Sequence, residues 1–276
     1  MTFYPEKFFS SLYAFFNRCH IFKYSGMQWG YAKAYFFYKK YYEDSLLFLT
    51  QHYPEIFKQG HILDIGANIG YTAVLFSTVI SPGYQIFAFE PEKWNFALLN
   101  RIVEANKLTR IISPQRLAVS EKQGIAKLWI NIQNQSDHRM ITPQFSGDPG
   151  SEIQTVSTTT LDDFVDAVIL KQFDSHTISF IKIDVQGVEW KICQGMARTL
   201  EKHPETILCM EYYPEGIKNM GDNPEDILSF FKDRHYRTYV LSRKKGLQAI
   251  EACPLEQALG LRGYVDLVFS KKELTR

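Results

Sequence analysis

The 276-residue sequence has almost no net charge, no closely spaced cysteines and no long apolar segment. Lys and Arg number 31 against 30 Asp and Glu, so no overall basic field favours a nucleic-acid partner. The four cysteines lie far apart, which disfavours zinc or redox motifs and predicts free buried thiols. No apolar run approaches the roughly 20 residues that span a bilayer, and no secretory signal is visible, so we expect a soluble, cytoplasmic protein.

Aromatic residues, 15% of the chain, crowd its first part. Residues 1–59 are expected to form a helical extension, in which 41–49 has the pattern of an amphipathic helix that ends before Pro54. This pattern favours a cap packed on the core over a membrane anchor, although peripheral membrane contact stays open. The sequence does not indicate an oligomeric state.

From residue 60 the pattern changes to alternating strands and helices, which predicts one α/β domain over 60–276 with a doubly wound, mostly parallel sheet. The strands are expected at 62–66, 85–89, 116–120, 125–132, 178–184, 206–210, 237–241 and 264–269. The helices are expected at 71–80, 93–106, 188–202 and 224–234. The polar stretch 134–152, with two prolines and two glycines, is predicted to be a long surface loop.

A glycine-containing turn follows the first strand of this domain. Asp64, Gly66, Asn68 and Gly70 lie between the strand and the next helix, where glycine lets the backbone bend sharply and approach a ligand. Glu90 ends the second strand, where a carboxylate accepts hydrogen bonds from a ribose diol. The spacing is not the GxGxxG of a dinucleotide site, so the pattern favours a nucleoside ligand without a pyrophosphate over a purely structural turn.

A second group of polar residues follows the strand 178–184. Asp184 ends that strand, where catalytic groups collect in this architecture, and Gly187 permits a tight turn. Glu189 falls in the first turn of the next helix, where it would either contact a substrate or stabilise the helix dipole.

Five segments in order resemble the FkbM-type methyltransferases. They are 64–70, 89–91, 117–120, 160–163 and 183–189, and the resemblance extends from His61 to Glu211. It implies a Rossmann-like class I methyltransferase fold over residues 60–276, with S-adenosylmethionine as cofactor. The family commonly has an acid where this chain has Gln186.

The resemblance also implies roles for individual residues. Asp64, Gly66, Asn68 and Gly70 would line the methionine and ribose side of the cofactor, and Glu90 would hold the ribose hydroxyls. The adenine would lie near Ala118 and be flanked by Trp94 or Asn95. Asp184 would face the sulfonium and take part in catalysis.

Residues of the polar loop and of the next strand are candidates for contact with the acceptor. His138 is a candidate general base and Arg139 a candidate for binding a phosphate or carboxylate, although both residues would also suit a solvated loop. Glu211 ends its strand as an acceptor contact or second base, and Tyr212 would pack against a sugar or cover the core. A metal held by His138, Asp184 and Glu211 is a minority hypothesis, and no metal motif is present.

Together these observations predict a methyltransferase that uses S-adenosylmethionine to methylate a hydroxyl of a sugar, glycan or natural product. Its partner would be that small-molecule or glycan acceptor. Two alternatives remain, a nicotinamide-dependent oxidoreductase and a non-catalytic module that binds S-adenosylmethionine. The first is disfavoured by Asn68, and the second is favoured by Gln186.

Overall fold

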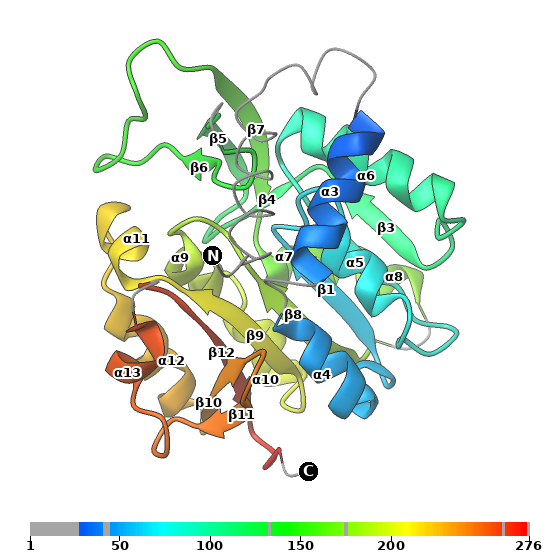
Figure 1. The fold of residues 1–276 in the computed structure, drawn as a ribbon, viewed down its shortest axis with the longest axis vertical. Coiled ribbons are helices and arrows are strands. Elements are labelled where there is room, and N and C mark those ends of the chain that lie inside the picture. The colour runs from blue at the N-terminus through cyan, green and yellow to red at the C-terminus, as the bar shows by residue number, and fades with distance from the viewer. Residues whose placement is uncertain (1–27, 41–44, 132–133, 174–175, 261–262, 275–276) are drawn as a thin grey trace, which may run out of the picture.

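The structure is a computed structural model that describes residues 28–40, 45–131, 134–173, 176–260 and 263–274. Its main sheet has the strand order β11-β10-β12-β9-β8-β1-β2-β3 (Figure 1). Five neighbouring strands are parallel: β3 (Ile112–Gln115), β2 (Ile86–Phe89), β1 (His61–Ile65), β8 (Ile178–Ile183) and β9 (Ile207–Tyr212). Three antiparallel strands complete the sheet: β12 (Val265–Ser270), β10 (Arg237–Ser242) and β11 (Gly246–Ala249).

A second sheet follows β3 in the chain and has the order β4-β7-β5-β6. Its strands are β4 (Ala118–Val119), β5 (Gly124–Trp129), β6 (Arg139–Met140) and β7 (Ile153–Thr159). Figure 1 shows it as a separate layer beside the main sheet. The short strand β6 pairs with β5 and therefore fixes part of the polar segment that was expected to be a loop.

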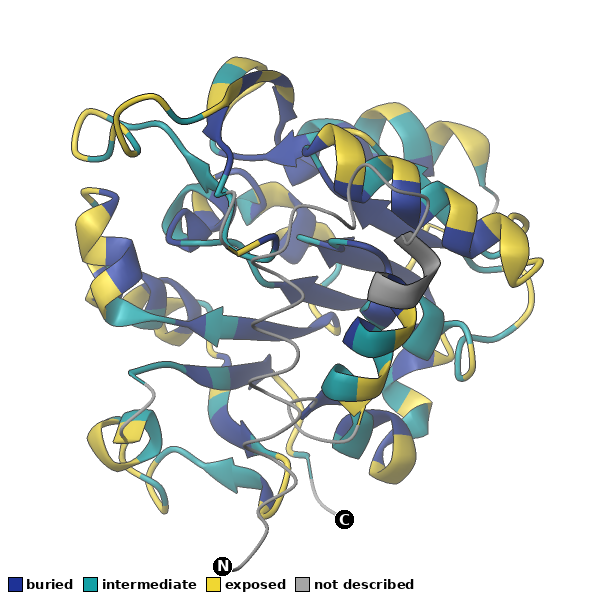
Figure 2. Cartoon of the chain, turned by 45° about the horizontal axis from the view of Figure 1, so that its top comes forward, coloured by how far each residue is buried: buried dark blue, intermediate teal, exposed yellow. Residues whose placement is uncertain are grey.

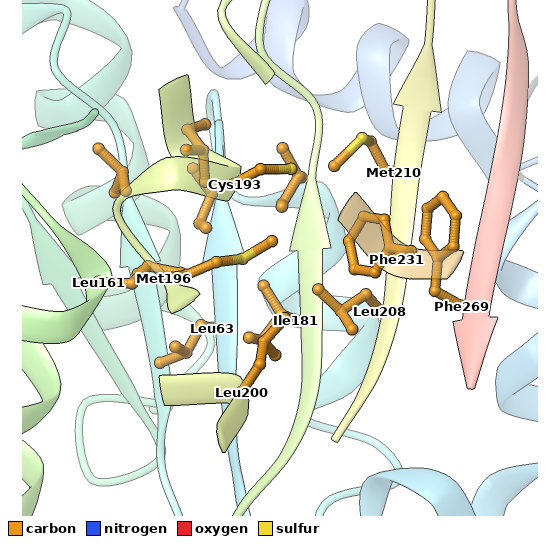
Figure 3. Close-up of a cluster of buried hydrophobic side chains, with 14 of the residues drawn as sticks. Leu63, Leu161, Ile181, Cys193, Met196, Leu200, Leu208, Met210, Phe231 and Phe269 are labelled. Atoms are coloured by element: carbon orange, nitrogen blue, oxygen red, sulfur yellow. The ribbon is translucent and has the colours of Figure 1, made fainter. Parts of the chain in front are cut away.

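Helices cover both faces of the main sheet, as expected of a doubly wound fold. The first face carries α4 (Leu46–His52), η2 (Pro54–Phe57), α5 (Tyr71–Phe76) and α6 (Lys93–Ala105), and α3 (Gln28–Tyr38) packs on α5 and α6. The second face carries α7 (Leu161–Phe164), η3 (Val165–Ile169), α8 (Leu170–Gln172), α9 (Glu189–Gln194), α10 (Ala197–Lys202), α11 (Pro214–Asn219), α12 (Pro224–Asp233) and α13 (Leu255–Leu259). Figure 3 shows the core of the second face, where Met196 and Phe231 pack on strand residues such as Ile181.

The central strands of the main sheet alternate their side chains between two apolar clusters, so β1, β2 and β8 are buried on both faces (Figure 2). In β9, Leu208, Met210 and Tyr212 belong to the cluster of the second face, and Cys209 belongs to that of the first. Because side chains alternate, Glu211 points to the first face together with Cys209. The same rule places Asp64, Lys182 and Asp266 on that face, so charged side chains from four strands share it.

The expected strands and helices are largely present, and the additions are β3, β6, β7, β11, α7, η3, α8, α11 and α13. The helix expected over 188–202 breaks into α9 and α10 at Gly195, which packs so closely that a Cβ would lie 2.2 Å from the Ser120 carbonyl oxygen. Of the expected helix 41–49, the described part begins at Leu46 and continues to His52. Three cysteines are free, with Cys193 and Cys209 buried, while Cys19 lies outside the described residues.

Candidate active site

A cavity of about 1220 Å³ lies beyond the carboxyl ends of the parallel strands, where ligands bind in open α/β sheets. At one end it is lined by the turn after β1, by Glu90 after β2 and by Ala118 of β4. Its other end is lined by Glu211, Asp266 and the turn between β10 and β11. The volume exceeds the roughly 300–1,000 Å³ of a typical small-molecule pocket, so a cofactor and a second molecule would fit together.

The turn after β1 has a backbone that only certain residues adopt. Gly66 has a φ of +75°, and a Cβ there would lie 1.9 Å from the carbonyl oxygen of Asp184. Asn68 also has a positive φ of 51°, and its side-chain Oδ1 accepts a hydrogen bond from the Ile69 N–H at 2.7 Å. This bond satisfies a backbone donor just before α5, and the turn leaves Gly66 and Asn68 on the cavity wall.

Glu90 lies at the carboxyl end of β2 and is 6% exposed. Its two oxygens accept hydrogen bonds from the backbone N–H groups of Asn68 and Glu92, both at 2.9 Å. Burial raises the pKa of Glu90 to about 8, although these two N–H groups stabilise the charged form. A ligand that donates hydrogen bonds would offset part of the cost of charging this carboxyl group.

A buried network behind Glu90 connects the two sheets, and the sequence analysis did not find it. Glu92 caps α6 by accepting from the backbone N–H groups of Trp94 and Asn95, and it also accepts from Gln154 Nε2 of β7 at 2.7 Å. Asn95 Nδ2 donates to the Gln135 carbonyl oxygen at 3.1 Å. These contacts hold the segment around Gln135 against the cavity. The sequence signal that could have indicated the network is Glu92, an acid at the N-cap position of the helix that follows Glu90.

Lys182 is a second residue that the sequence analysis missed. Its ammonium group lies 3.3 Å from Asp64 Oδ1 and 3.4 Å from Asp184 Oδ2, and it donates to the Gly66 carbonyl oxygen at 2.8 Å. Burial by itself would lower the pKa of Lys182, but the carboxylates of Asp184 and Asp64 raise it above the ordinary value. Burial likewise opposes ionisation of Asp184, and the charge of Lys182 outweighs it and lowers the pKa of Asp184.

Glu211 and Asp266 are cross-strand neighbours of β9 and β12 at the other end of the cavity. Ser45, just before α4, donates a hydrogen bond to Asp266. Burial, followed by the charges of Asp184 and Asp266, raises the pKa of Glu211 well above its ordinary value. Glu211 and Asp184 face the same cavity.

The loop candidates His138 and Arg139 both line the cavity. His138 Nδ1 lies 3.1 Å from the backbone N–H of Asn131 and accepts its hydrogen bond, so the neutral ring carries its proton on Nε2. In this tautomer the ring offers a donor, and a general base would need the opposite arrangement. Arg139 Nε donates to Asp137 at 2.7 Å, and its guanidinium lies 5.7 Å from the centre of the Phe145 ring.

Five candidate residues do not line the cavity: Asp64, Gly70, Trp94, Glu189 and Tyr212. Asp64 is fully buried and holds Thr72 and Lys182, so it lies behind the turn. Tyr212 points to the core of the opposite face because side chains alternate along β9, and Tyr213 lines the cavity in its place. Glu189 is 1% exposed and accepts from the Gly187 N–H, and burial raises its pKa to about 8.

Within the described part of the chain, no three His, Cys, Asp or Glu side chains are grouped as a metal site. His138, Asp184 and Glu211 line one cavity without forming such a group. The described helices also include none that is long and apolar enough to cross a membrane.

Solved structures that are similar to this chain include methyltransferases. One is a methyltransferase FkbM from Methylobacillus flagellatus KT, with 14% identity and a TM-score of 0.45 over 83% of this chain and 46% of that one. Another is an O-methyltransferase from Bacillus cereus in complex with SAH, with 15% identity and a TM-score of 0.42 over 82% and 78% of the two chains. The present chain spans less than half of the length of the first, and curated protein sequences give no match.

The comparison with family models is more direct. The model of the methyltransferase FkbM domain matches residues 64–238, which is more than half of the chain. The match begins at the buried Asp64 and includes the turn after β1, Glu90, Asp184 and Glu211. The chain therefore belongs to the FkbM family of S-adenosylmethionine-dependent methyltransferases.

Proposed function

We propose that this protein binds S-adenosylmethionine and methylates a hydroxyl oxygen of a sugar, glycan or natural-product acceptor. The observation that carries the proposal is the single cavity in which Gly66, Asn68 and Glu90 lie at one end and Glu211 at the other. Asp184, after β8, also lines this cavity. One cavity would thus hold a nucleoside cofactor and an acceptor with a carboxyl group near the acceptor.

The chemistry of the donor set fits the cofactor. Glu90 has lone pairs beyond the two that its backbone donors use, so it would accept hydrogen bonds from the ribose hydroxyls. The carboxylate of Asp184, kept ionised by Lys182, would favour the cationic methionine part. Ala118 and Asn95 would lie beside the adenine. The bound cofactor would supply a methyl group already activated by its sulfonium.

Glu211 is the group that we assign as general base. Burial raises the pKa of Glu211, so its ionised carboxylate would be a stronger proton acceptor than an ordinary glutamate, and a cation bound nearby would help it to ionise. In the reaction the acceptor oxygen would bond to the methyl carbon as the carbon–sulfur bond breaks, and Glu211 would take the hydroxyl proton. His138 would instead position the loop through the hydrogen bond that its Nδ1 accepts from the Asn131 N–H.

The nicotinamide alternative is disfavoured by the same turn that favours a nucleoside. The Asn68 side chain bonds to the Ile69 N–H at the point where a dinucleotide fold places the pyrophosphate. Family membership also favours methyl transfer. The non-catalytic alternative makes a different prediction, because it retains cofactor binding without turnover.

The test is calorimetric titration of S-adenosylhomocysteine into the purified protein, with NADH as the control. We expect binding of the former alone, followed by methyl transfer from labelled S-adenosylmethionine to one of a panel of sugar and natural-product hydroxyls. Absence of S-adenosylhomocysteine binding would contradict the proposal. Binding without transfer to any member of the panel would support the non-catalytic module.

A further inference from the structure

The turn between β10 and β11 places three consecutive cations on the rim of the cavity. Arg243, Lys244 and Lys245 are all exposed and all line the cavity. The formal net charge of the whole chain is only +1, so this turn is a local concentration of positive charge. Such a cluster more often faces only solvent, and its position on the cavity wall is what distinguishes it.

The turn is held in place by its neighbours. Ser242 pairs with Gly246 across the hairpin, and its hydroxyl accepts a hydrogen bond from the Lys245 N–H at 3.0 Å. Gly246 has a φ of +72°, and a Cβ there would lie 2.3 Å from the Phe48 ring of α4. The backbone that carries the cations is therefore packed on the same face as the charged residues of the site.

The cations of the cavity differ in how far their charges are already neutralised. Lys182 pairs with Asp64 and Asp184, and Arg139 pairs with Asp137. Lys244 and Lys245 have no ion pair with any acidic side chain of the described residues. An anion at the rim would therefore meet two ammonium groups whose charge is not already paired.

The strand register relates this rim to the proposed base. Leu241 of β10 pairs with Asp266 of β12, and Asp266 pairs with Glu211 of β9. Two strand spacings, about 10 Å in all, therefore separate the start of the turn from Glu211. That separation is comparable to the span of a sugar with its phosphate. Tyr213 and Tyr264 line the cavity as well and would offer apolar faces to a sugar ring.

We infer that the Arg243–Lys245 turn binds a phosphate group of the acceptor while the acceptor hydroxyl lies at Glu211. This inference rests on the proposed function, because that proposal identifies the region beside Glu211 as the acceptor site. The shared chemistry is a phosphate ester, which either a soluble sugar phosphate or a lipid headgroup would present. Lysine ammonium groups bind phosphate as point charges, so the attraction falls as ionic strength rises.

The test uses two probes and three proteins. Inorganic pyrophosphate is titrated by calorimetry, and vesicles of phosphatidylcholine with and without phosphatidylglycerol are used in co-sedimentation. The proteins are the wild type, Lys244→Glu/Lys245→Glu and the control Lys271→Glu/Lys272→Glu. The control changes two adjacent exposed lysines by the same charge, just after β12 and at the other end of the strands from the β10–β11 turn.

We expect pyrophosphate to bind the wild type and the control, and to bind Lys244→Glu/Lys245→Glu at least about tenfold more weakly. Binding to phosphatidylglycerol vesicles alone, with the same dependence on the variants, would assign the phosphate to a lipid headgroup. Equal affinity in all three proteins, or no binding of either probe, would overturn the inference. Titration of each protein with S-adenosylhomocysteine tests the proposed function separately. If S-adenosylhomocysteine does not bind the wild type, the proposed function is wrong, but the pyrophosphate titration still decides whether the turn binds phosphate.

Discussion

The two ends of the cavity differ in how their charges are arranged. At the end formed by β1, β2 and β8, each charged group has fixed partners, as in the Lys182 pairs and the two N–H groups on Glu90. At the end formed by β9, β12 and the β10–β11 turn, Glu211 and Asp266 are neighbouring carboxyl groups, and Lys244 and Lys245 have no ion pair with a described acid.

The difference suits two kinds of ligand. A set of partners that is fixed before binding costs little reorganisation and suits one invariant cofactor. The ammonium groups of Lys244 and Lys245 would be stabilised by an anionic group of a ligand, which suits an acceptor that carries a charge of its own. The segments 64–70 and 89–91, which resemble the family, lie at the end formed by β1, β2 and β8. The other end contains the carboxyl and ammonium groups on which the choice of acceptor would depend.

The largest expected effect comes from removing Lys182, the buried cation at the end of the cavity formed by β1, β2 and β8. Lys182→Met leaves the fully buried Asp64 without its counter-charge and should destabilise the protein by about 3–5 kcal/mol. Urea unfolding measures this loss, with the exposed Lys127→Met as the control. The double variant Asp64→Asn/Lys182→Met should recover part of it, because it removes the uncompensated charge. A loss for Lys182→Met as small as that of the control would show that the pair contributes little.

Gly66→Ala should have the next largest effect. The substitution forces a side chain into a positive φ and against the Asp184 carbonyl oxygen, at a cost of about 2–4 kcal/mol, and should abolish S-adenosylhomocysteine binding. Gly83→Ala is a matched control, because Gly83 has a φ of +92° with no atom within 4 Å of a Cβ. Equal losses of stability in the two variants would mean that the close approach at Gly66 is unimportant.

Glu211→Gln tests the other end of the cavity. We expect turnover to fall by about 100-fold while S-adenosylhomocysteine binding is retained, because the variant removes only the proton acceptor. The wild-type rate should rise with pH as Glu211 ionises, and the variant should lose this rise. The exposed Glu215→Gln is the control. An unchanged pH profile in Glu211→Gln would refute the base assignment.

Glu90 and Glu189 are two buried carboxyl groups whose variants can be compared directly. Both have a pKa raised to about 8, but only Glu90 lines the cavity. Their folded-state pKa values exceed the unfolded values, so the stability that each contributes is complete below about pH 4.5 and declines as pH rises toward 8. Each Gln variant should flatten that decline in unfolding experiments.

Binding should separate these two variants. We expect Glu90→Gln to weaken S-adenosylhomocysteine binding by about tenfold, because it removes an acceptor for the ribose hydroxyls. Glu189→Gln should leave the affinity unchanged. The same weakening in both variants would place Glu90 among the structural residues.

His138→Ala should have the smallest effect. The ring accepts one backbone hydrogen bond, so its loss should reduce turnover by less than about tenfold and spare cofactor binding. Turnover on the same acceptor measures the effect, with Glu211→Gln as the reference. A larger loss in His138→Ala than in Glu211→Gln would restore His138 as the base.

Local pattern was sufficient to predict most of the parallel core. β1, β2 and β8 are buried on both faces and are therefore nearly continuous apolar runs that end in a glycine or an acid. The same runs predicted Glu90 and Asp184 on the cavity wall, because strand ends and ligand sites coincide in this architecture. The strand β7 was missed because its exposed and buried residues alternate and most of them are polar or small.

The sequence by itself determined the family, the order of the core strands along the chain and the turn in which Gly66 and Asn68 adopt positive φ, since these depend on neighbouring residues. Only the tertiary structure decided that Lys182 joins Asp64 to Asp184 and that Tyr213, rather than Tyr212, lines the cavity. It also brought the Arg243–Lys245 turn to the cavity that holds Glu90. These relations depend on strand pairing and on which face a side chain takes, and both are set by contacts between residues far apart in the chain.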